Sequence, residues 1–590
     1  MITKKYLSLI SKIIIVFLTL VLCIWFIPNY TKGIDVTDTC FSLIKYKYSF
    51  NQQLSLTTFS TIFTDILGGI IYHAASSHQL LIMNLANAAF YTISSLFIIA
   101  LFKKELPVNL LLFIALICNF FSLSNMHIFN YNTTSLFALT FAFGTLLCSL
   151  RRNDDKLLFV SGFICGINVF FRLPNILHTS MALGILWYTI FCKKMPVKTG
   201  FRKFFKYISG ILLSILLGVI LSVLYLGSSS ISATITQTFD SFTDHSSGNS
   251  HSALSIFAKL KYHYSVVFDN WIMILIILFF ITLSIYLLSK YVLKLQSNNT
   301  IIRMLCICLG LFLSIFSFYK TKKLYNLDFK LYAFWMIIIV LSLIVSLWGA
   351  FYYHNKNSFI STACFLNSLL IVILPIGTDV GCLYYNYFLF IPTCIFSISL
   401  SHIQIKLDNQ KKKHFIYYFL CTYLLCYTCI SGFFYQNSYI YRDDTYSNLT
   451  TKLNIPELAG MHTTKERADM ITLTTSLLAP YSDYEIATLG DFNVLPVITD
   501  MKCFFSTPWP DLSSFPPAEF ITEADEKINK GILPVIVLTP QLSIVSDKNS
   551  PYRSTEKYKK LLDIISKNNY QTLYKSDNLE IYIPLKENEL

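Results

Sequence analysis

The chain has 590 residues, of which 54% are hydrophobic and only 14% are charged. An average soluble domain is about 45–50% apolar and about 25% charged, so this composition excludes an ordinary soluble protein. Lys and Arg number 47 against 33 Asp and Glu. The basic clusters lie at the ends of apolar segments, so we do not expect nucleic acid as a partner.

Apolar segments recur along the first three quarters of the chain, and each is long enough to cross a bilayer as a helix. Helices are expected because lipid offers no partners to backbone amides. The sequence predicts an all-α polytopic membrane protein with about thirteen crossings and its N-terminus inside. The predicted crossings are Tyr6–Ile27, Leu80–Phe102, Asn109–Leu123, a segment ending at Arg152, Leu157–Phe171, Ile176–Phe191, Tyr207–Leu226, Trp271–Leu288, Ile301–Phe318, Tyr332–Phe351, Phe359–Ile376, Tyr387–Leu400 and Phe415–Phe434.

The first outer loop covers residues 28–79 and contains two aspartates, Asp35 and Asp38, shortly after the first crossing. A carboxylate at the membrane face can take a proton from an acceptor hydroxyl or amine. Two alternatives are open: the pair holds a divalent cation, or one of them caps a helix that begins near Thr39.

The same loop contains a moderately apolar stretch, Leu54–Tyr72, which is interrupted by polar residues such as Asp65. We expect this stretch to be a helix that lies in the interface rather than a crossing. If it crossed, most basic clusters would move to the outer side, against the positive-inside rule. The clusters expected inside are Lys4-Lys5, Lys103-Lys104, Arg151-Arg152, Lys193–Lys206, Lys290–Lys294 and Lys411–Lys413.

The run Arg172-Leu173-Pro174-Asn175 separates two apolar segments at the predicted outer side. An arginine at a membrane boundary is costly unless it is paired, and its planar fork suits a phosphate. The alternative is a snorkelling arginine at a helix turn.

Two later outer segments are also candidates for binding. Lysines 320, 322, 323 and 330 depart from the positive-inside pattern, which a site for a lipid phosphate would explain, and plain surface charge near the headgroups is the alternative. A tight turn, Gly377–Gly381, is followed by side chains suited to sugar hydroxyls, and its alternative is a simple interhelical turn. The residues concerned are Lys320, Lys322, Lys323, Lys330, Asp379, Tyr384, Tyr385 and Asn386.

The chain changes character at residue 436. From there it has 15 Lys and Arg against 21 Asp and Glu, whereas the part before it has 32 against 12. Alternating strand and helix patterns predict an extracytoplasmic α/β domain over residues 436–590, beside a transmembrane domain over residues 1–435. The expected strands are Glu485–Leu489, Pro534–Thr539 and Leu579–Ile583, and the expected helices are Thr464–Leu478, Ala518–Lys530 and Thr555–Asn568.

The sequence resembles the GT-C class of integral membrane glycosyltransferases, which includes protein O-mannosyltransferases and lipid A aminoarabinose transferases. The resemblance rests on the acidic first loop, Asp35–Phe41, on the many crossings and on the outer C-terminal domain. It also resembles bacterial members with an R-x-P-N turn, here Arg172–Asn175, and a late Gly-rich turn, here Gly377–Gly381. One difference is that Thr39 follows Asp38, where better-known members have an Asp-Glu pair.

The resemblance implies an enzyme of the bacterial cytoplasmic membrane that transfers a sugar, with inversion, from a polyprenyl-phosphate donor. The acceptor would be a glycan, lipid or protein at the outer face, and membrane lipids would surround the protein. Asp38 would be the base and Asp35 the second choice, with no certain cofactor and a divalent cation as an open question. From their residue types and positions, we expect Arg172, Lys320, Lys322 and Lys323 to bind the phosphate, and Asn175, Asp379, Tyr384, Tyr385 and Asn386 to bind the substrate.

Three other functions are weighed against this one. A transporter or flippase would favour ionisable residues at mid-membrane and internal repeats, and neither pattern is present. A polymerase of lipid-linked oligosaccharides would favour a larger outer loop in mid-chain than residues 227–269 provide. A non-catalytic envelope assembly protein is the third alternative.

Overall fold

The computed structural model describes most of the membrane part up to residue 228 and most of the C-terminal part. The described residues are 2–27, 29–50, 56, 58–122, 128–228, 308–316, 332–376, 390–402, 440, 442–512, 515–539 and 554–585, with isolated positions at 231, 232, 236, 258, 261, 265, 319, 388 and 430.

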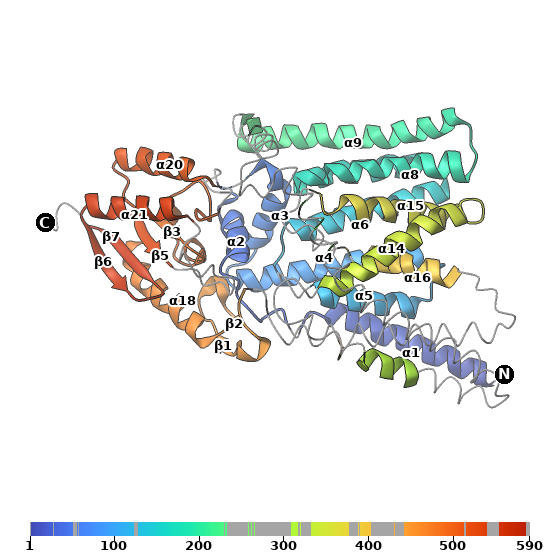
Figure 1. The fold of residues 1–590 in the computed structure, drawn as a ribbon, viewed down its shortest axis with the longest axis horizontal. Coiled ribbons are helices and arrows are strands. Elements are labelled where there is room, and N and C mark those ends of the chain that lie inside the picture. The colour runs from blue at the N-terminus through green and yellow to red at the C-terminus, as the bar shows by residue number, and fades with distance from the viewer. Residues whose placement is uncertain are drawn as a thin grey trace.

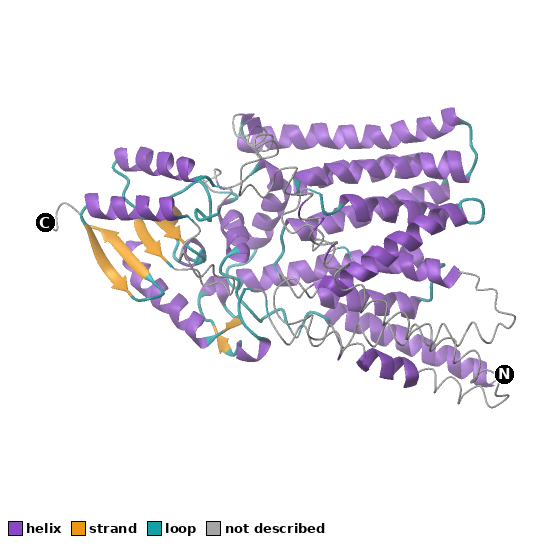
Figure 2. Cartoon of the chain, viewed as in Figure 1, coloured by secondary structure: helices purple, strands orange, loops and turns teal. Residues whose placement is uncertain are grey.

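A bundle of helices forms one end of the molecule and a small sheet forms the other (Figures 1 and 2). Among the described residues, four helical stretches are long and apolar enough to cross a membrane: Gln79–Phe102, Tyr131–Arg152, Leu173–Cys192 and Val197–Leu226. The predicted number of thirteen stays a prediction. The predicted crossings Trp271–Leu288 and Phe415–Phe434, and most of Ile301–Phe318, lie outside the described residues.

Most described bundle helices begin and end within about four residues of the predicted segments, but α9 begins at Val197, ten residues before the predicted start at Tyr207. The stretch after Arg172 is continuous, but it begins as a 3-10 helix and ends in a π-helical turn. The bounds are α1 Ile2–Ile24, α4 Gln79–Phe102, α5 Val108–Ser122, α6 Tyr131–Arg152, α7 Asp155–Phe171, η3 Leu173–Ala182, α8 Leu183–Leu186, η4 Trp187–Cys192, α9 Val197–Leu226, α14 Tyr332–Tyr353, α15 Ser358–Ile373 and α16 Phe390–His402.

Close backbone contact joins α7 and α9, and glycines make it possible. A Cβ atom on Gly162 would lie 2.1 Å from the Tyr207 carbonyl oxygen, and one on Gly210 would lie 2.2 Å from the Phe159 carbonyl oxygen. Small residues at helix crossings are a common packing device in membranes, because they let two backbones approach.

The positively charged helix ends of the bundle face away from the sheet. Residues at the start of α4 and just before α6 pack in one core with the C-terminal part. The opposite ends of these helices bear Lys103 and Arg152, and Lys203 contacts Asp155 at 2.7 Å near that end. The sheet therefore lies at the less basic end of the bundle (Figure 1).

The first loop forms two short helices, which lie between the bundle and the sheet (Figure 1): α2 over Asp38–Tyr48 and α3 over Ile62–His73, the latter preceded by the 3-10 turn η2 at Phe59–Thr61. Helix α3 therefore begins about eight residues after Leu54, the predicted start of the helix expected at Leu54–Tyr72. With 12 residues, α3 is shorter than the ~20 residues that a crossing requires.

The C-terminal part contains a five-stranded sheet in the order β4-β3-β5-β7-β6. Strands β4, β3 and β5 are parallel, whereas β7 is antiparallel to both β5 and β6. The bounds are β3 Glu485–Leu489, β4 Lys502–Cys503, β5 Val535–Leu538, β6 Tyr570–Lys575 and β7 Glu580–Pro584, with the helices α18 Lys465–Leu478, α19 Leu495–Ile498, α20 Pro517–Asn529 and α21 Thr555–Lys567.

A two-stranded pair, β1 at Thr451–Lys452 and β2 at His462–Thr463, and the 3-10 turns η8 at Tyr446–Asn448, η9 at Pro456–Leu458 and η10 at Ala479–Tyr481 complete the C-terminal part. The strands and helices predicted from the sequence are all present within one or two residues. Strands β1, β2, β4 and β6 and helix α19 are not among the predicted elements.

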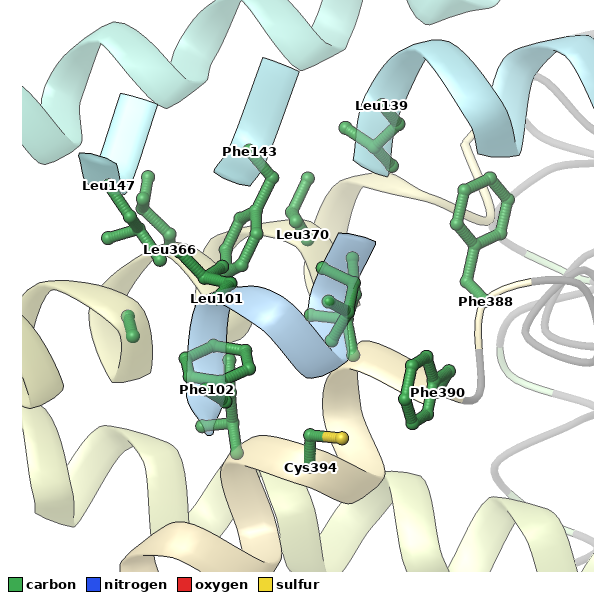
Figure 3. Packing of buried hydrophobic residues seen from close by; sticks show 14 of the residues in the cluster. Leu101, Phe102, Leu139, Phe143, Leu147, Leu366, Leu370, Phe388, Phe390 and Cys394 are labelled. Carbon is green, nitrogen blue, oxygen red and sulfur yellow. The ribbon is translucent and has the colours of Figure 1, made fainter. Parts of the chain in front are cut away.

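Two large hydrophobic cores hold the described structure together. One lies inside the bundle, where Phe102, Phe143 and Leu370 interdigitate from α4, α6 and α15 (Figure 3). The other joins first-loop residues, including Ile34 and Leu43, to C-terminal residues such as Ile471. The predicted boundary at residue 436 stays a prediction, and the first loop shares its core with residues on the C-terminal side of that boundary.

Candidate functional site

Asp35 is buried and its two carboxylate oxygens accept hydrogen bonds at the start of α2. Oδ1 accepts from the backbone N–H of Thr37 at 2.9 Å and from its hydroxyl at 2.5 Å, and Oδ2 accepts from the N–H of Thr39 at 2.8 Å. Burial, and next the charge of Asp38, raise the pKa of Asp35. Asp35 lies two residues before Thr37, the N-cap of α2, and its carboxylate satisfies N–H groups at this end of the helix, as in the capping alternative from the sequence.

Asp38 is the first residue of α2 and is about a third exposed, at 34% of its side chain. Its Oδ2 lies 3.2 Å from Nη1 of Arg442, which follows the membrane part of the chain. A carboxylate in the first turn of a helix is also stabilised by the helix dipole. Asp38 thus combines access to solvent with a defined ionic contact.

Arg442 connects three parts of this site. Besides Asp38, Nη1 donates to the Thr37 hydroxyl at 2.5 Å, and the guanidinium carbon lies 5.5 Å from the centre of the Trp509 ring. Arg442 has a φ of 52°. That left-handed conformation costs an arginine roughly 1–2 kcal/mol.

Buried ionic contacts support the backbone around Arg442. Arg467 Nη1 lies 2.9 Å from Asp443 Oδ1 and donates to the carbonyls of Ile34 and Arg442 at 2.9 and 2.8 Å. Asp443 accepts the N–H of Ile34 at 2.7 Å and is also bound by the hydroxyl of Thr463. Burial raises the pKa of Asp443, and the positive charge of Arg467 opposes that rise.

Sequence reasoning missed Arg442, Asp443 and Arg467. A signal was available, because Arg442-Asp443-Asp444 follows the last predicted crossing on the side where basic residues are least expected. The partners in the first loop lie some 400 residues earlier in the chain, so no local pattern links them.

The far end of α2 is also joined to the C-terminal part. Lys47 donates to the carbonyls of Pro496 and Val497 at 3.0 and 2.8 Å, and it pairs with Asp500 at 3.0 Å. The hydroxyl of Tyr48 donates to the Met501 carbonyl at 2.9 Å. Helix α2 is therefore fixed at both ends.

A buried ion pair fixes α2 to α3. Lys45 Nζ lies 3.3 Å from Asp65 Oδ2 and 3.2 Å from the hydroxyls of Thr58 and Thr61. The two charged side chains are only 7% and 4% exposed. Burial raises the pKa of Asp65, and the charge of Lys45 opposes the rise.

Arg172 follows the last residue of α7, and its guanidinium carbon lies 5.5 Å from the centre of the Tyr131 ring. Nearby, the hydroxyl of Thr64 in α3 donates to the Phe171 carbonyl at 3.0 Å, so this turn borders the first loop. Asn175 is buried, and its amide nitrogen donates to Ser135 at 2.7 Å and to Asn168 at 3.0 Å. Its described contacts are therefore structural, and its role toward a substrate stays a prediction.

The structure brings Asp35 and Asp38 together and places Arg172 beside the same loop. The other predicted site residues lie outside the described part of the chain, namely Lys320, Lys322, Lys323, Asp379, Tyr384, Tyr385 and Asn386.

The carboxylates of the first loop are surrounded by donors rather than by further metal ligands. Within the described residues, no three His, Cys, Asp or Glu side chains gather in a group that could hold a metal ion. Asp35 is occupied by N–H and O–H groups, and Asp38 by a guanidinium. A divalent cation at the two aspartates therefore stays a prediction.

No protein-family model matches the sequence, and no curated protein sequence matches it. The structure is similar to crystal structures of the Archaeoglobus fulgidus oligosaccharyltransferase. The apo form has 12% identity and a TM-score of 0.45 over 90% of this chain and 69% of that chain. The form tethered to an acceptor peptide has 12% identity and a TM-score of 0.48 over 98% and 74%.

A third structure, of the archaeal enzyme AglB from the same organism in complex with an inhibitory peptide and a dolichol-phosphate, has 13% identity and a TM-score of 0.44 over 91% and 70%. At TM-scores below 0.5, these similarities decide neither the fold nor the activity of this chain.

Proposed function

We propose that the protein is a GT-C-class glycosyltransferase of the bacterial cytoplasmic membrane. It transfers a sugar from a polyprenyl-phosphate donor to a glycan, lipid or protein acceptor at the outer face. The observation that carries the proposal is Asp38: a partly exposed carboxylate, paired with Arg442, at the end of the bundle away from the basic clusters.

Asp38 acts as the general base in this proposal. It takes the proton of the acceptor hydroxyl or amine as that atom forms a bond to the anomeric carbon of the sugar. The bond from this carbon to the phosphate oxygen breaks with inversion, and the lipid phosphate leaves with the electron pair. Asp35 suits this step less, because it is only 6% exposed and its two oxygens already accept hydrogen bonds.

Fixed cations assist the leaving phosphate, on which negative charge grows in the transition state. Arg172 is a candidate because it ends a bundle helix beside the first loop. The lysines at 320, 322 and 323 are proposed for the same phosphate, and the residues Asn175, Asp379, Tyr384, Tyr385 and Asn386 for the sugar and acceptor.

The proposed sidedness follows from the charge distribution. Basic residues near membrane helices remain inside, and Lys103, Arg152 and Lys203 lie at the bundle end away from the sheet. The C-terminal part, proposed as a domain over residues 436–590, would then be extracytoplasmic, on the same side as Asp38.

The test is transfer by purified protein in nanodiscs, supplied with radiolabelled polyprenyl-phosphate sugars and a membrane extract as acceptor. We expect Asp38→Asn to lower turnover about 100-fold or more, as expected for loss of a general base, and Asp38→Glu to retain part of it. Wild-type protein that transfers no sugar from any such donor would overturn the function. Full turnover in Asp38→Asn would overturn the base.

A further inference from the structure

The proposed base, Asp38, makes an ionic contact with a residue of the C-terminal part. Arg442 reaches Asp38 Oδ2 at 3.2 Å and the Thr37 hydroxyl at 2.5 Å with the same nitrogen, Nη1. Thr37 in turn donates to Asp35. The guanidinium therefore holds both the base and the residue that precedes it.

The backbone around Arg442 is built to present this side chain. The residue has a φ of 52°, in the left-handed region that arginine seldom occupies. A turn maintains it: the N–H of Asp443 donates to the Ile440 carbonyl at 3.0 Å, and Arg467 donates to the Arg442 carbonyl at 2.8 Å. Unfavourable backbone conformations persist where the surroundings enforce them, and they cluster at functional sites.

We infer that Arg442 is the positioning residue of Asp38: it fixes the carboxylate in the orientation from which the acceptor proton is taken. The inference rests on the proposed function and assigns a role to a residue of the C-terminal part in the chemistry of the first loop. A guanidinium suits this role because it is cationic throughout the physiological range and its planar donors restrict the carboxylate.

The contact of Lys47 makes it possible to distinguish positioning of Asp38 from simple attachment of α2 to the C-terminal part. Lys47 also joins α2 to the C-terminal part, through Asp500 and two carbonyls, but it acts at the opposite end of the helix. Loss of either Arg442 or Lys47 therefore removes one attachment of α2, whereas only the loss of Arg442 changes the surroundings of Asp38.

The experiment compares Arg442→Asn, Arg442→Lys and the matched control Lys47→Gln in the sugar-transfer assay. Asn tolerates a positive φ, so Arg442→Asn removes the cation without straining the turn. We expect Arg442→Asn to lower kcat about 10- to 100-fold with KM within about twofold, since small misplacement of a catalytic group has effects of this size. Arg442→Lys should recover part of the loss, and Lys47→Gln should stay within about twofold of wild type.

A double variant tests whether Arg442 acts through Asp38 or only attaches α2 to the C-terminal part. If Arg442 acts through Asp38, then Arg442→Asn should cost nothing further in an Asp38→Asn background, because coupled residues are not additive. Equal losses in Arg442→Asn and Lys47→Gln, or additive losses in the double variant, would overturn the inference while leaving the proposed base intact. Full activity of Asp38→Asn would overturn the proposed base itself.

An assay without turnover checks the contact directly. Wild type, Arg442→Asn and Lys47→Gln are treated with a neutral diazo reagent that esterifies carboxyl groups, and labelling of Asp38 is measured by mass spectrometry. We expect labelling of Asp38 to change at least threefold in Arg442→Asn and to match wild type in Lys47→Gln. Unchanged labelling in Arg442→Asn would overturn the inference whether or not the donor sugar is known.

Discussion

Asp35 and Asp38 are three residues apart but have different surroundings. Asp35 is buried beneath the first turn of α2 and accepts three hydrogen bonds, whereas Asp38 is about a third exposed and faces Arg442. The carboxylate of Asp35 is used in hydrogen bonds at the start of α2, whereas that of Asp38 is partly open to solvent. The sequence alone favours Asp38 through family resemblance, but the reason for the difference is three-dimensional, since Arg442 lies 405 residues after Thr37.

The structural role of Asp35 can be tested with Asp35→Ala. The variant leaves the N–H groups of Thr37 and Thr39 buried without their acceptor, so we expect it to lower the free energy of unfolding by about 1–3 kcal/mol. The measurement is chemical unfolding of the purified protein in detergent.

The matched control for that measurement is Asp154→Ala. Asp154 is the N-cap of α7 and also accepts two backbone N–H groups, those of Lys156 and Leu157, but it is exposed, so water replaces the lost acceptor. If Asp35→Ala lowers the free energy of unfolding by no more than Asp154→Ala does, the structural role of Asp35 is contradicted.

At the scale of elements, α2 is held by ionic contacts at its start, its end and its side. The side contact is the Lys45–Asp65 pair to α3. A buried ion pair often contributes little compared with an apolar pair of similar volume, but removal of a single partner leaves an uncompensated buried charge. The pair therefore makes the α2–α3 packing sensitive to single substitutions.

We expect Asp65→Leu to lower the free energy of unfolding by about 3–5 kcal/mol, and the double variant Lys45→Met with Asp65→Leu to recover most of that loss. Chemical unfolding in detergent measures both. Lys567→Met is the control, because it breaks an exposed pair with Asp563 that is expected to contribute at most about 1 kcal/mol. A double variant as unstable as Asp65→Leu would contradict the expectation.

Element prediction worked where the pattern is local and long. The long apolar runs predict the bundle helices. The alternation of strand-like and helix-like segments in the C-terminal part predicts β3, β5 and β7. It failed for β4, which has two residues, and α19, which has four, because such short elements have no period to detect. Strand β6 was missed because its mixed polar sequence follows α21 directly, and its pairing with β7 depends on the rest of the sheet.

For the whole molecule, the charge distribution predicts one orientation in the membrane. We expect a cysteine at Ser576, in an exposed turn of the C-terminal part, to react with an impermeant maleimide applied to intact cells. A cysteine at Lys104, at the opposite end of the bundle, should react only after the cells are opened. The parent protein gives the background from native cysteines, and labelling of Ser576→Cys only in opened cells would reverse the proposed sidedness.

The core shared by the first loop and the C-terminal part has a consequence for the order of biosynthesis. Residues such as Ile34 and Leu43 are made early, whereas Ile471 and the arginine that meets Asp38 are made roughly 400 residues later. At roughly 5–20 residues per second, about 20–80 seconds separate the two events. During that time the first loop lacks its partners in the shared core, so the candidate site can be assembled only after about three quarters of the chain have been made.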